Sequence, residues 1–316
     1  MSITLTQLRS FLAVVRNGSV TGAAEELVVT QPSVSAAVAA LSREVGVGLT
    51  ERMGRTIRTS DAGKAFAPYA SDVIGLLEQG QRAAREVGAT SQRQLRIAAV
   101  TTAAEYVVPP LMQAFQANRP DLELTVEVGN RGLVFERAAE HAADVAIGGR
   151  PPGDGRLVGD AFLENEIAVI APADDPLAKR RRVPVRELGD RAWLLREEGS
   201  GTRAMTEQFL ASHELTPRVL TLGSNGAIKQ ASRAGLGVSL QSRTAVALEL
   251  EAGLLSELRL REELPMRHWY LLRSSIGPVR EAVRAFTEFV KQPQAREAVE
   301  AAQRGAGGLR SLNSTK

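Results

Sequence analysis

The stretch that decides the fold is residues 30–59, TQPSVSAAVAALSREVGVGLTERMGRTIRT. Thr30 is a typical N-cap, and Pro32 falls in the first helical turn, where its missing N–H is not needed. Gly46 marks the end of the helix. The apolar residues between them recur at steps of four, three and four, which predicts one buried helix face: Val34, Val38, Leu41 and Val45.

Two shorter helices are expected before this one, the first ending at Asn17-Gly18 and the second capped by Ser19. Their apolar positions are Leu5, Leu8, Leu12, Val15, Val20, Ala23, Ala24 and Leu27. Two helices joined by a tight turn, the second with a polar N-terminal tip, form a helix-turn-helix. The outward residues of that tip can hydrogen-bond to bases or phosphates: Gln31, Ser33 and Ser35.

Residues 49–59 predict a β-hairpin centred on Gly54. They hold one glutamate and three arginines, Arg52, Arg55 and Arg58, a charge pattern suited to a wing along a phosphate backbone. The alternative is a three-helix bundle with a solvated hairpin. The combination of turn, capped polar helix and arginine hairpin favours DNA binding over that alternative.

A long helix is expected from Asp61 to about Val87. Gly75 and Gly80 weaken this helix, since glycine costs roughly 1 kcal/mol in a helix interior. Its seven-residue repeat predicts a coiled-coil seam with a second copy of the chain, and the alternative is packing against its own domain. The repeat consists of Ala62, Phe66, Tyr69, Val73, Leu76, Gly80, Ala83 and Val87, of which Phe66, Tyr69, Val73, Leu76 and Ala83 are the candidate dimerisation residues.

Beyond a linker at residues 88–94, strand and helix patterns alternate to residue 290. Repeated β-α units predict a mostly parallel sheet with helices on both faces, here as two α/β lobes with a cleft between them. The expected domains are residues 1–60 for DNA binding, 61–90 for the linker helix and 91–295 for the two lobes. Lobe I takes residues 91–165 and 269–295, lobe II takes 166–268, and a mobile tail is expected at 296–316.

Ligands of open α/β sheets bind where strands end and helices begin. Such junctions in this chain carry hydroxyl, amide or guanidinium groups, which with free helix N–H groups suit a carboxylate, sulfate or phosphate. The alternative is that these residues are ordinary N-caps. The candidate effector residues are Thr101, Thr102, Asn130, Ser200, Gly201, Thr202, Arg203, Ser224 and Asn225.

The chain lacks the residues on which several classes of protein function depend. The chain has no cysteine, and its three histidines form no metal-binding pair, so we expect no metal site. The dinucleotide and Walker motifs are absent, and residues 237–241 miss the hydrolase nucleophile motif, so no catalytic residues are expected. The net charge of +3 equals that of residues 291–316 alone, so a nucleic-acid site must come from local arrangement. Neither a membrane span nor a signal peptide is evident, which predicts a cytoplasmic protein.

Residues 5–63 closely resemble the N-terminus of LysR-type transcriptional regulators, and the likeness extends to about Val290. The matching residues are Leu8-Arg9-Ser10-Phe11, Gly18-Ser19, Ala23-Ala24, Thr30-Gln31-Pro32-Ser33-Val34-Ser35, Leu41, Glu44-Val45-Gly46, Glu51-Arg52, Gly54-Arg55 and Thr59 through Gly63. The run from Thr101 to Pro109 looks like the branch that regulates carbon fixation and sulfur assimilation.

This resemblance implies an α/β fold class: a winged helix-turn-helix, a long linker helix, and a two-lobe effector domain like type 2 periplasmic solute-binding proteins. It assigns DNA contacts to Gln31, Pro32, Ser33, Ser35, Arg52, Arg55 and Arg58. It also implies a homodimer or homotetramer on double-stranded promoter DNA, RNA polymerase as a further candidate partner, and no cofactor other than a small anionic effector. Four residues depart from the family pattern and affect the expected operator sequence: Gly22, Ala36, Ala37 and Thr50.

The sequence therefore predicts a ligand-responsive transcription factor that is not an enzyme. The alternative is a cytoplasmic solute-binding protein or small-molecule enzyme with an accessory helical N-terminus, which would give no specific DNA footprint.

Overall fold

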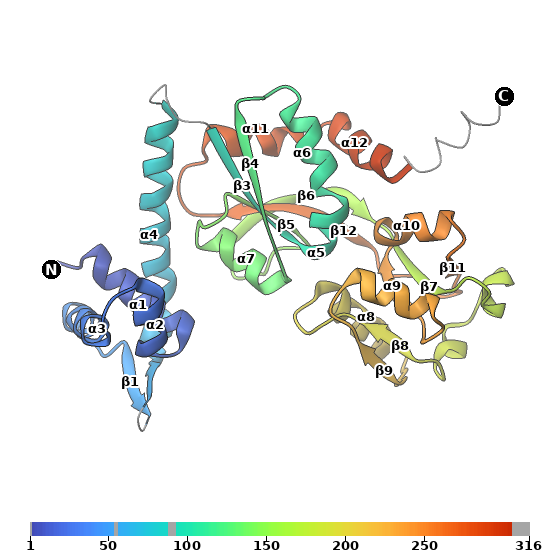
Figure 1. The fold of residues 1–316 in the computed structure, drawn as a ribbon, viewed down its shortest axis with the longest axis horizontal. Helices are drawn as coiled ribbons and strands as arrows, with labels where there is room; N and C mark the ends of the chain where they lie inside the picture. Colours follow the sequence, from blue (N-terminus) through green and yellow to red (C-terminus); the bar gives the residue numbers. More distant parts are fainter. Residues whose placement is uncertain (1, 54–55, 88–92, 305–316) are drawn as a thin grey trace. The chain divides into compact units, whose positions relative to one another are not determined.

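The computed structural model describes residues 2–53, 56–87 and 93–304 (Figure 1). They divide into an N-terminal unit, residues 1–91 with 139–142, and a C-terminal unit, residues 92–138 with 143–316. Within the described part of the chain, no helix is long and apolar enough to cross a membrane. In the same residues, no group of three or more acidic or histidine side chains is placed to hold a metal ion.

The N-terminal unit contains α1 (Leu5–Asn17), α2 (Val20–Leu27), α3 (Gln31–Val45), β1 (Thr50–Met53), β2 (Thr56–Thr59) and α4 (Asp61–Val87). Each of the first three helices has the cap that the sequence predicts or an equivalent one, with Thr4, Ser19 and Thr30 accepting from backbone N–H groups. The apolar faces meet in one core that includes Phe11, Val34 and Leu41, all fully buried. The predicted three helices and hairpin are confirmed.

Helix α4 spans the residues expected, but its repeat does not form one exposed seam. Phe66 packs against Phe11 of its own unit, with ring centroids 5.8 Å apart. For this residue the alternative interpretation, packing against its own domain, is correct. Tyr69 and Val73 stay exposed, at 71% and 50%.

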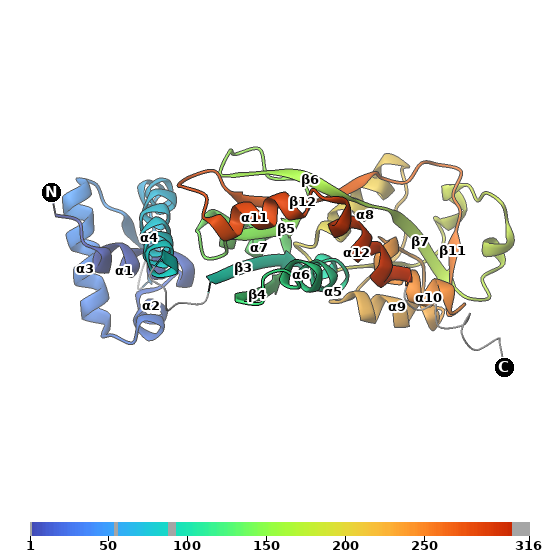
Figure 2. The same ribbon diagram turned by 90° about the horizontal axis from the view of Figure 1, so that it is seen from above.

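Lobe I of the C-terminal unit is built on a five-stranded sheet of order β4-β3-β5-β12-β6. Its strands are β3 (Arg93–Val100), β4 (Leu122–Gly129), β5 (Val145–Gly148), β6 (Leu157–Asn165) and β12 (Arg267–Ser274). Its helices are α5 (Thr101–Tyr106), α6 (Val108–Gln116), α7 (Arg131–Ala139), α11 (Glu281–Phe289) and α12 (Pro293–Arg304). Side chains of α6, α11 and α12 share one core with the sheet, centred on the rings of Phe115, Phe286 and Phe289. Figure 2 shows the ribbons of these three helices beside the sheet.

Lobe II contains a three-stranded sheet of order β10-β7-β11 and a parallel pair, β8 and β9. Its strands are β7 (Ile167–Pro172), β8 (Trp193–Leu195), β9 (Val219–Thr221), β10 (Ser239–Ser242) and β11 (Leu255–Leu258). Its helices are α8 (Gly201–Ser212), α9 (Asn225–Arg233) and α10 (Arg243–Glu251), with 3-10 turns at Pro176–Lys179 and Val185–Leu188. Trp193 is fully buried and its indole N–H donates to Leu188 O at 3.1 Å.

The expectation of a mostly parallel sheet is wrong. Strand β12 runs antiparallel to β5 and β6, and β7 is flanked by antiparallel β10 and β11. Only the β3–β4, β3–β5 and β8–β9 pairs among the named ladders are parallel. The chain leaves lobe I after β6 and returns to it in β12. The path of this return sets the direction of β12, and the pattern of apolar residues gives no information about it.

The expected mobile tail is also wrong for residues 296–304, because α12 extends through them. Its apolar residues Ala295 and Val299 are buried in the lobe I core at 1% and 0% exposure. Residues 305–316 lie outside the described residues. Lobe I therefore ends with a docked helix.

We expect Val299→Asp to destabilise the C-terminal unit by about 3 kcal/mol or more, because it buries an unpaired charge against the sheet. The matched control is Ala302→Asp, at an exposed position of the same helix. Thermal denaturation followed by circular dichroism measures both. Equal melting temperatures for the two variants would mean that α12 does not dock.

Candidate functional site

The tip of α3 is a polar surface held in place by a buried residue. Val34 is fully buried, while the four tip residues around it are exposed: Gln31, Pro32, Ser33 and Ser35. The Thr30 and Ser33 hydroxyls lie 2.8 Å apart, and Thr30 Oγ1 accepts from the Ser33 N–H at 3.4 Å. Ser35 is also exposed, and within the described residues its hydroxyl makes no such hydrogen bond. The tip thus combines free polar groups with the positive end of a helix.

The hairpin pairs Glu51 with Arg58 and Arg52 with Ile57 in antiparallel register. Arg58 is exposed. Arg55 and the side chain of Arg52 lie outside the described residues. The turn before α3 passes through Val28, whose φ of 56° ends α2 in the left-handed region. Helix, turn, helix and hairpin follow one another as a winged helix-turn-helix requires.

A cleft between lobes I and II is the second candidate site. It is lined by strand ends and helix starts, among them Thr101 and Thr102 after β3, Asn130 after β4, and Ser200, Gly201 and Thr202 at the start of α8. The space between these groups is about 30 Å³, enough for about two water molecules. The cleft is therefore narrow at this point, and it continues along α8 into two wider hollows of about 520 and 380 Å³, which share Arg131 and Gly201 with it.

One buried hydrogen-bond network joins the two lobes behind this cavity. The guanidinium of Arg196 in lobe II donates to Asn225 Oδ1 at 2.7 Å and pairs with the Glu197 carboxylate at 2.7 Å. The Asn225 amide in turn donates to two lobe I side chains, Thr102 Oγ1 at 3.2 Å and Glu105 Oε2 at 2.8 Å. Arg196, Asn225 and Thr102 are buried, so these bonds are strengthened by the low local dielectric.

A second bridge lies at Lys229 of α9. Its ammonium group donates to Tyr106 Oη of lobe I at 3.2 Å and pairs with Glu249 at 2.7 Å. Burial lowers the pKa of Lys229, but its hydrogen bonds to Glu249 and Tyr106 outweigh burial, so the net shift is upward. Lys229 therefore stays charged and holds the lobes together on this side.

Arg267, at the start of β12, is the cleft cation whose charge is not balanced. Among the described residues it has no carboxylate partner, and its closest polar contacts are Gly201 O at 3.5 Å and Met205 Sδ at 3.8 Å. Burial lowers the pKa of the Arg267 guanidinium, and the positive charge of Arg131 lowers it further. Arg131 and Arg267 thus place two positive charges beside the N-terminus of α8, a combination of groups that suits an anion.

The predicted effector residues divide into two groups. Six of them line the cleft: Thr101, Thr102, Asn130, Ser200, Gly201 and Thr202. Of the other three, Arg203 pairs with Glu207 and lines the adjoining hollow with Arg131, whereas Ser224 caps α9 and Asn225 is buried in the interlobe network. The capping alternative also holds in part, since Ser200 and Asn130 accept from Thr202 N and Leu133 N.

Sequence reasoning missed three arginines of the cleft: Arg131, Arg196 and Arg267. Arg131 directly follows the predicted Asn130. The rule that ligands bind where strands end could therefore have identified it. Arg267 begins a strand that returns from lobe II, so no local motif connects it with Gly201.

We expect Arg267→Gln to leave the melting temperature of the ligand-free protein unchanged or raised, because it removes an unbalanced buried charge. Arg196→Gln is the comparison. It should lower stability by about 3 kcal/mol, since it leaves Glu197 and Asn225 without their buried partner. Differential scanning calorimetry compares the two. A larger loss for Arg267→Gln than for Arg196→Gln would contradict the assigned charge balance.

Comparisons with known proteins agree with this geometry. Residues 5–64 match the model of the bacterial regulatory helix-turn-helix protein, lysR family, and residues 88–295 match the LysR substrate binding domain. The RuBisCO operon transcriptional regulator of Allochromatium vinosum is 36% identical over 94% of this chain and 98% of its own length. The HTH-type transcriptional activator CmpR of Synechocystis sp. is 34% identical over 91% and 94%.

Solved structures give the same result. The CcmR regulatory domain of Synechocystis PCC6803, determined in complex with 2-PG, is 33% identical with a TM-score of 0.60 over 63% of this chain and 96% of that one. A full-length OxyR variant from Pseudomonas aeruginosa, at 23% identity, shares the fold with a TM-score of 0.67 over 94% and 97%. The two family models together cover most of the chain, with a winged helix-turn-helix in one unit and a two-lobe effector fold in the other. The chain belongs to the LysR family of bacterial transcriptional regulators.

Proposed function

We propose that the α3 tip and the hairpin of this regulator bind double-stranded promoter DNA, and that a small anion in the interlobe cleft controls the outcome. The observation that carries the second half is Arg267, a partly buried cation that lines the cleft together with Arg131 and has no carboxylate partner among the described residues. An anion between Arg267, Arg131 and the α8 N-terminus would neutralise both guanidinium groups and accept from free N–H groups.

The relatives support an anionic effector. The 2-PG molecule bound by the CcmR domain is an anionic metabolite, and that domain is 33% identical to this chain. The RuBisCO operon regulator among the relatives agrees with the resemblance of residues 101–109 to the branch for carbon fixation. We therefore place the effector of this chain among small phosphorylated or carboxylated metabolites.

The size of the cleft indicates how such a ligand would act. The part of the cleft beside Thr102 and Ser200, about 30 Å³, holds only water, so a ligand that reaches Thr102 from the wider part beside Arg131 and Gly201 would have to rearrange the bridges between the lobes. The bonds from Asn225 to Thr102 and from Lys229 to Tyr106 would be the ones affected. A ligand that prefers the more open arrangement shifts the population towards it. That shift would alter the DNA complex formed by an oligomer.

We propose a dimer formed partly through α4, with the tetramer and contact with RNA polymerase as further proposals. Tyr69 and Val73 are exposed apolar side chains four residues apart on this helix. A second copy of the helix is the partner that a repeat of this spacing favours. Leu76 and Ala83, which continue the repeat, are partly buried.

For the DNA interface, we expect Ser35→Ala to weaken specific binding by about 1–3 kcal/mol without changing the salt dependence, as for a lost base contact. Arg58→Ala should instead reduce the slope of log K against log salt concentration by about one, as for a lost phosphate contact. Fluorescence anisotropy with the promoter duplex measures both, and Ser275→Ala, on the C-terminal unit, is the control.

If neither Ser35→Ala nor Arg58→Ala changes binding relative to Ser275→Ala, the proposed interface is wrong. If the wild-type chain gives no specific footprint on its own promoter region, the alternative of a solute-binding protein or enzyme is favoured.

For the cleft, we expect Arg267→Gln to weaken binding of 2-PG at least tenfold, because one charge-assisted contact is lost. Thr102→Val should keep the DNA affinity of the ligand-free protein while reducing its response to 2-PG. Arg243→Gln, which alters an arginine paired with Glu257 away from the cleft, is the matched control. Calorimetric titration and DNA binding with and without 2-PG give both quantities. Equal 2-PG affinity in Arg267→Gln and Arg243→Gln would refute the cleft assignment.

A further inference from the structure

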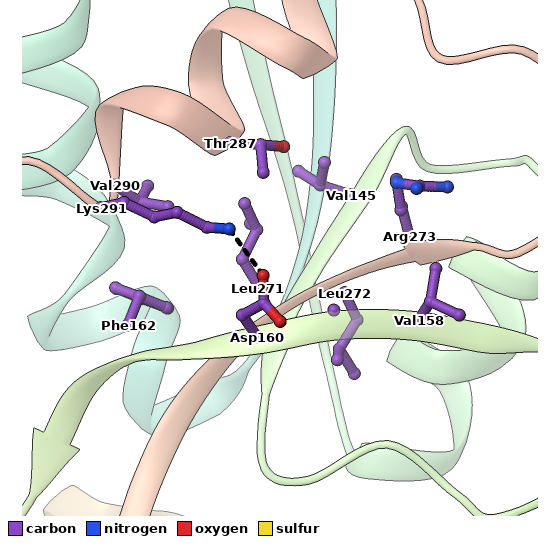
Figure 3. Close-up of a pocket in the computed structure, with 11 residues that line it drawn as sticks. Val145, Val158, Asp160, Phe162, Leu271, Leu272, Arg273, Thr287, Val290 and Lys291 are labelled. Carbon is purple, nitrogen blue, oxygen red and sulfur yellow. Dashed lines mark hydrogen bonds and ion pairs between the residues drawn. The ribbon is translucent and has the colours of Figure 1, made fainter.

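Lobe I has a second cavity, which shares no lining residue with the interlobe cleft. It lies where the end of α11 passes over β5, β6 and β12 (Figure 3). Its volume is about 290 Å³, close to the lower end of the roughly 300–1,000 Å³ typical of small-molecule sites. The proposed function leaves this cavity without a role.

The walls of the cavity are mainly apolar. Val145 is fully buried, and Leu271 and Val290 are buried at 6% and 3% exposure. Val158 and Phe162 of β6 also line the cavity and are more exposed. These side chains can cover the body of a small apolar group on several sides, which is how small-molecule pockets hold their ligands.

The polar groups of the cavity carry one unbalanced positive charge. Lys291 and Asp160 form an ion pair of 2.6 Å on one side, as Figure 3 shows. Arg273 stands on the other side, next to its cross-strand partner Val158. In the part of the chain that the structure describes, Arg273 has no carboxylate partner, and it donates only to the carbonyl of the adjacent Ser274, at 2.9 Å.

Access to the cavity needs little rearrangement. The Lys291 and Asp160 side chains are 52% and 67% exposed. An exposed pair of this kind contributes at most about 1 kcal/mol, so its side chains can move aside. Gly159, between Val158 and Asp160, keeps the backbone of β6 close to β12, because a Cβ there would lie 1.9 Å from Leu271 O. The floor is thus rigid and the rim is adjustable.

We propose that this cavity is a second ligand site of the chain, for a small monocarboxylate with a short apolar body. The body would contact Val145, Val158 and Leu271, and the carboxylate would accept from the Arg273 guanidinium. A neutral ligand would leave Arg273 unbalanced, and a cation would be repelled by it. The site is independent of the cleft residues, so it does not depend on the proposed effector.

The experiment uses the full-length chain and hexanoate as probe, with ligand-observed NMR to obtain Kd. Hexanol and hexylammonium are the matched neutral and cationic probes. We expect hexanoate to bind at least tenfold more tightly than either. Arg273→Gln should reduce that preference at least fivefold, and Val158→Trp, which fills the cavity from a half-exposed strand position, should abolish binding.

Arg267→Gln, which alters the cleft alone, should leave the Kd of hexanoate unchanged. Melting temperatures show that each variant is folded, and the Arg273 and Val158 variants test the site separately. The proposal is overturned if wild-type protein does not bind hexanoate, if hexanol binds equally well, or if binding is lost in Arg267→Gln and kept in Arg273→Gln.

Discussion

The C-terminal unit depends on how it satisfies one buried cation, Arg196. A buried guanidinium must be paired, and Arg196 is paired by Glu197 beside it and by the Asn225 amide. Because Asn225 also donates to Thr102 and Glu105, the same bonds connect lobe II to lobe I. The cleft narrows to a few tens of Å³ beside this connection, and Arg267 lies where it widens, without a carboxylate partner among the described residues.

Much of the N-terminal unit could be predicted because its information is local. Caps at Ser19 and Thr30 and the apolar spacing of α3 give helix starts and buried faces directly. The same reasoning did not predict α12, because charged and polar residues dominate its segment. Its buried residues Ala295 and Val299 are nevertheless four residues apart, as on one helix face. The direction of β12 and the partner of Phe66 are decided by tertiary packing, which no short window contains.

The effector cleft shows the same division. Residues at strand ends, such as Thr102 and Ser200, were predictable because the sheet gathers these ends together. Arg203 looked equally suitable by type, but Glu207 lies one helical turn away and takes its charge. Arg267 is brought to Gly201 by the return of the chain from lobe II. What distinguishes the two arginines is whether a carboxylate lies within reach, and only the fold decides that.

Unbalanced arginines therefore indicate more about function here than arginines as a class. Arg191, Arg196 and Arg203 have acidic partners and serve the structure of lobe II. Arg267 and Arg273 lie on one strand, β12, and each faces a cavity without a described carboxylate partner. Keeping a cation in such a place lowers stability, and an anion that binds there restores it by mass action.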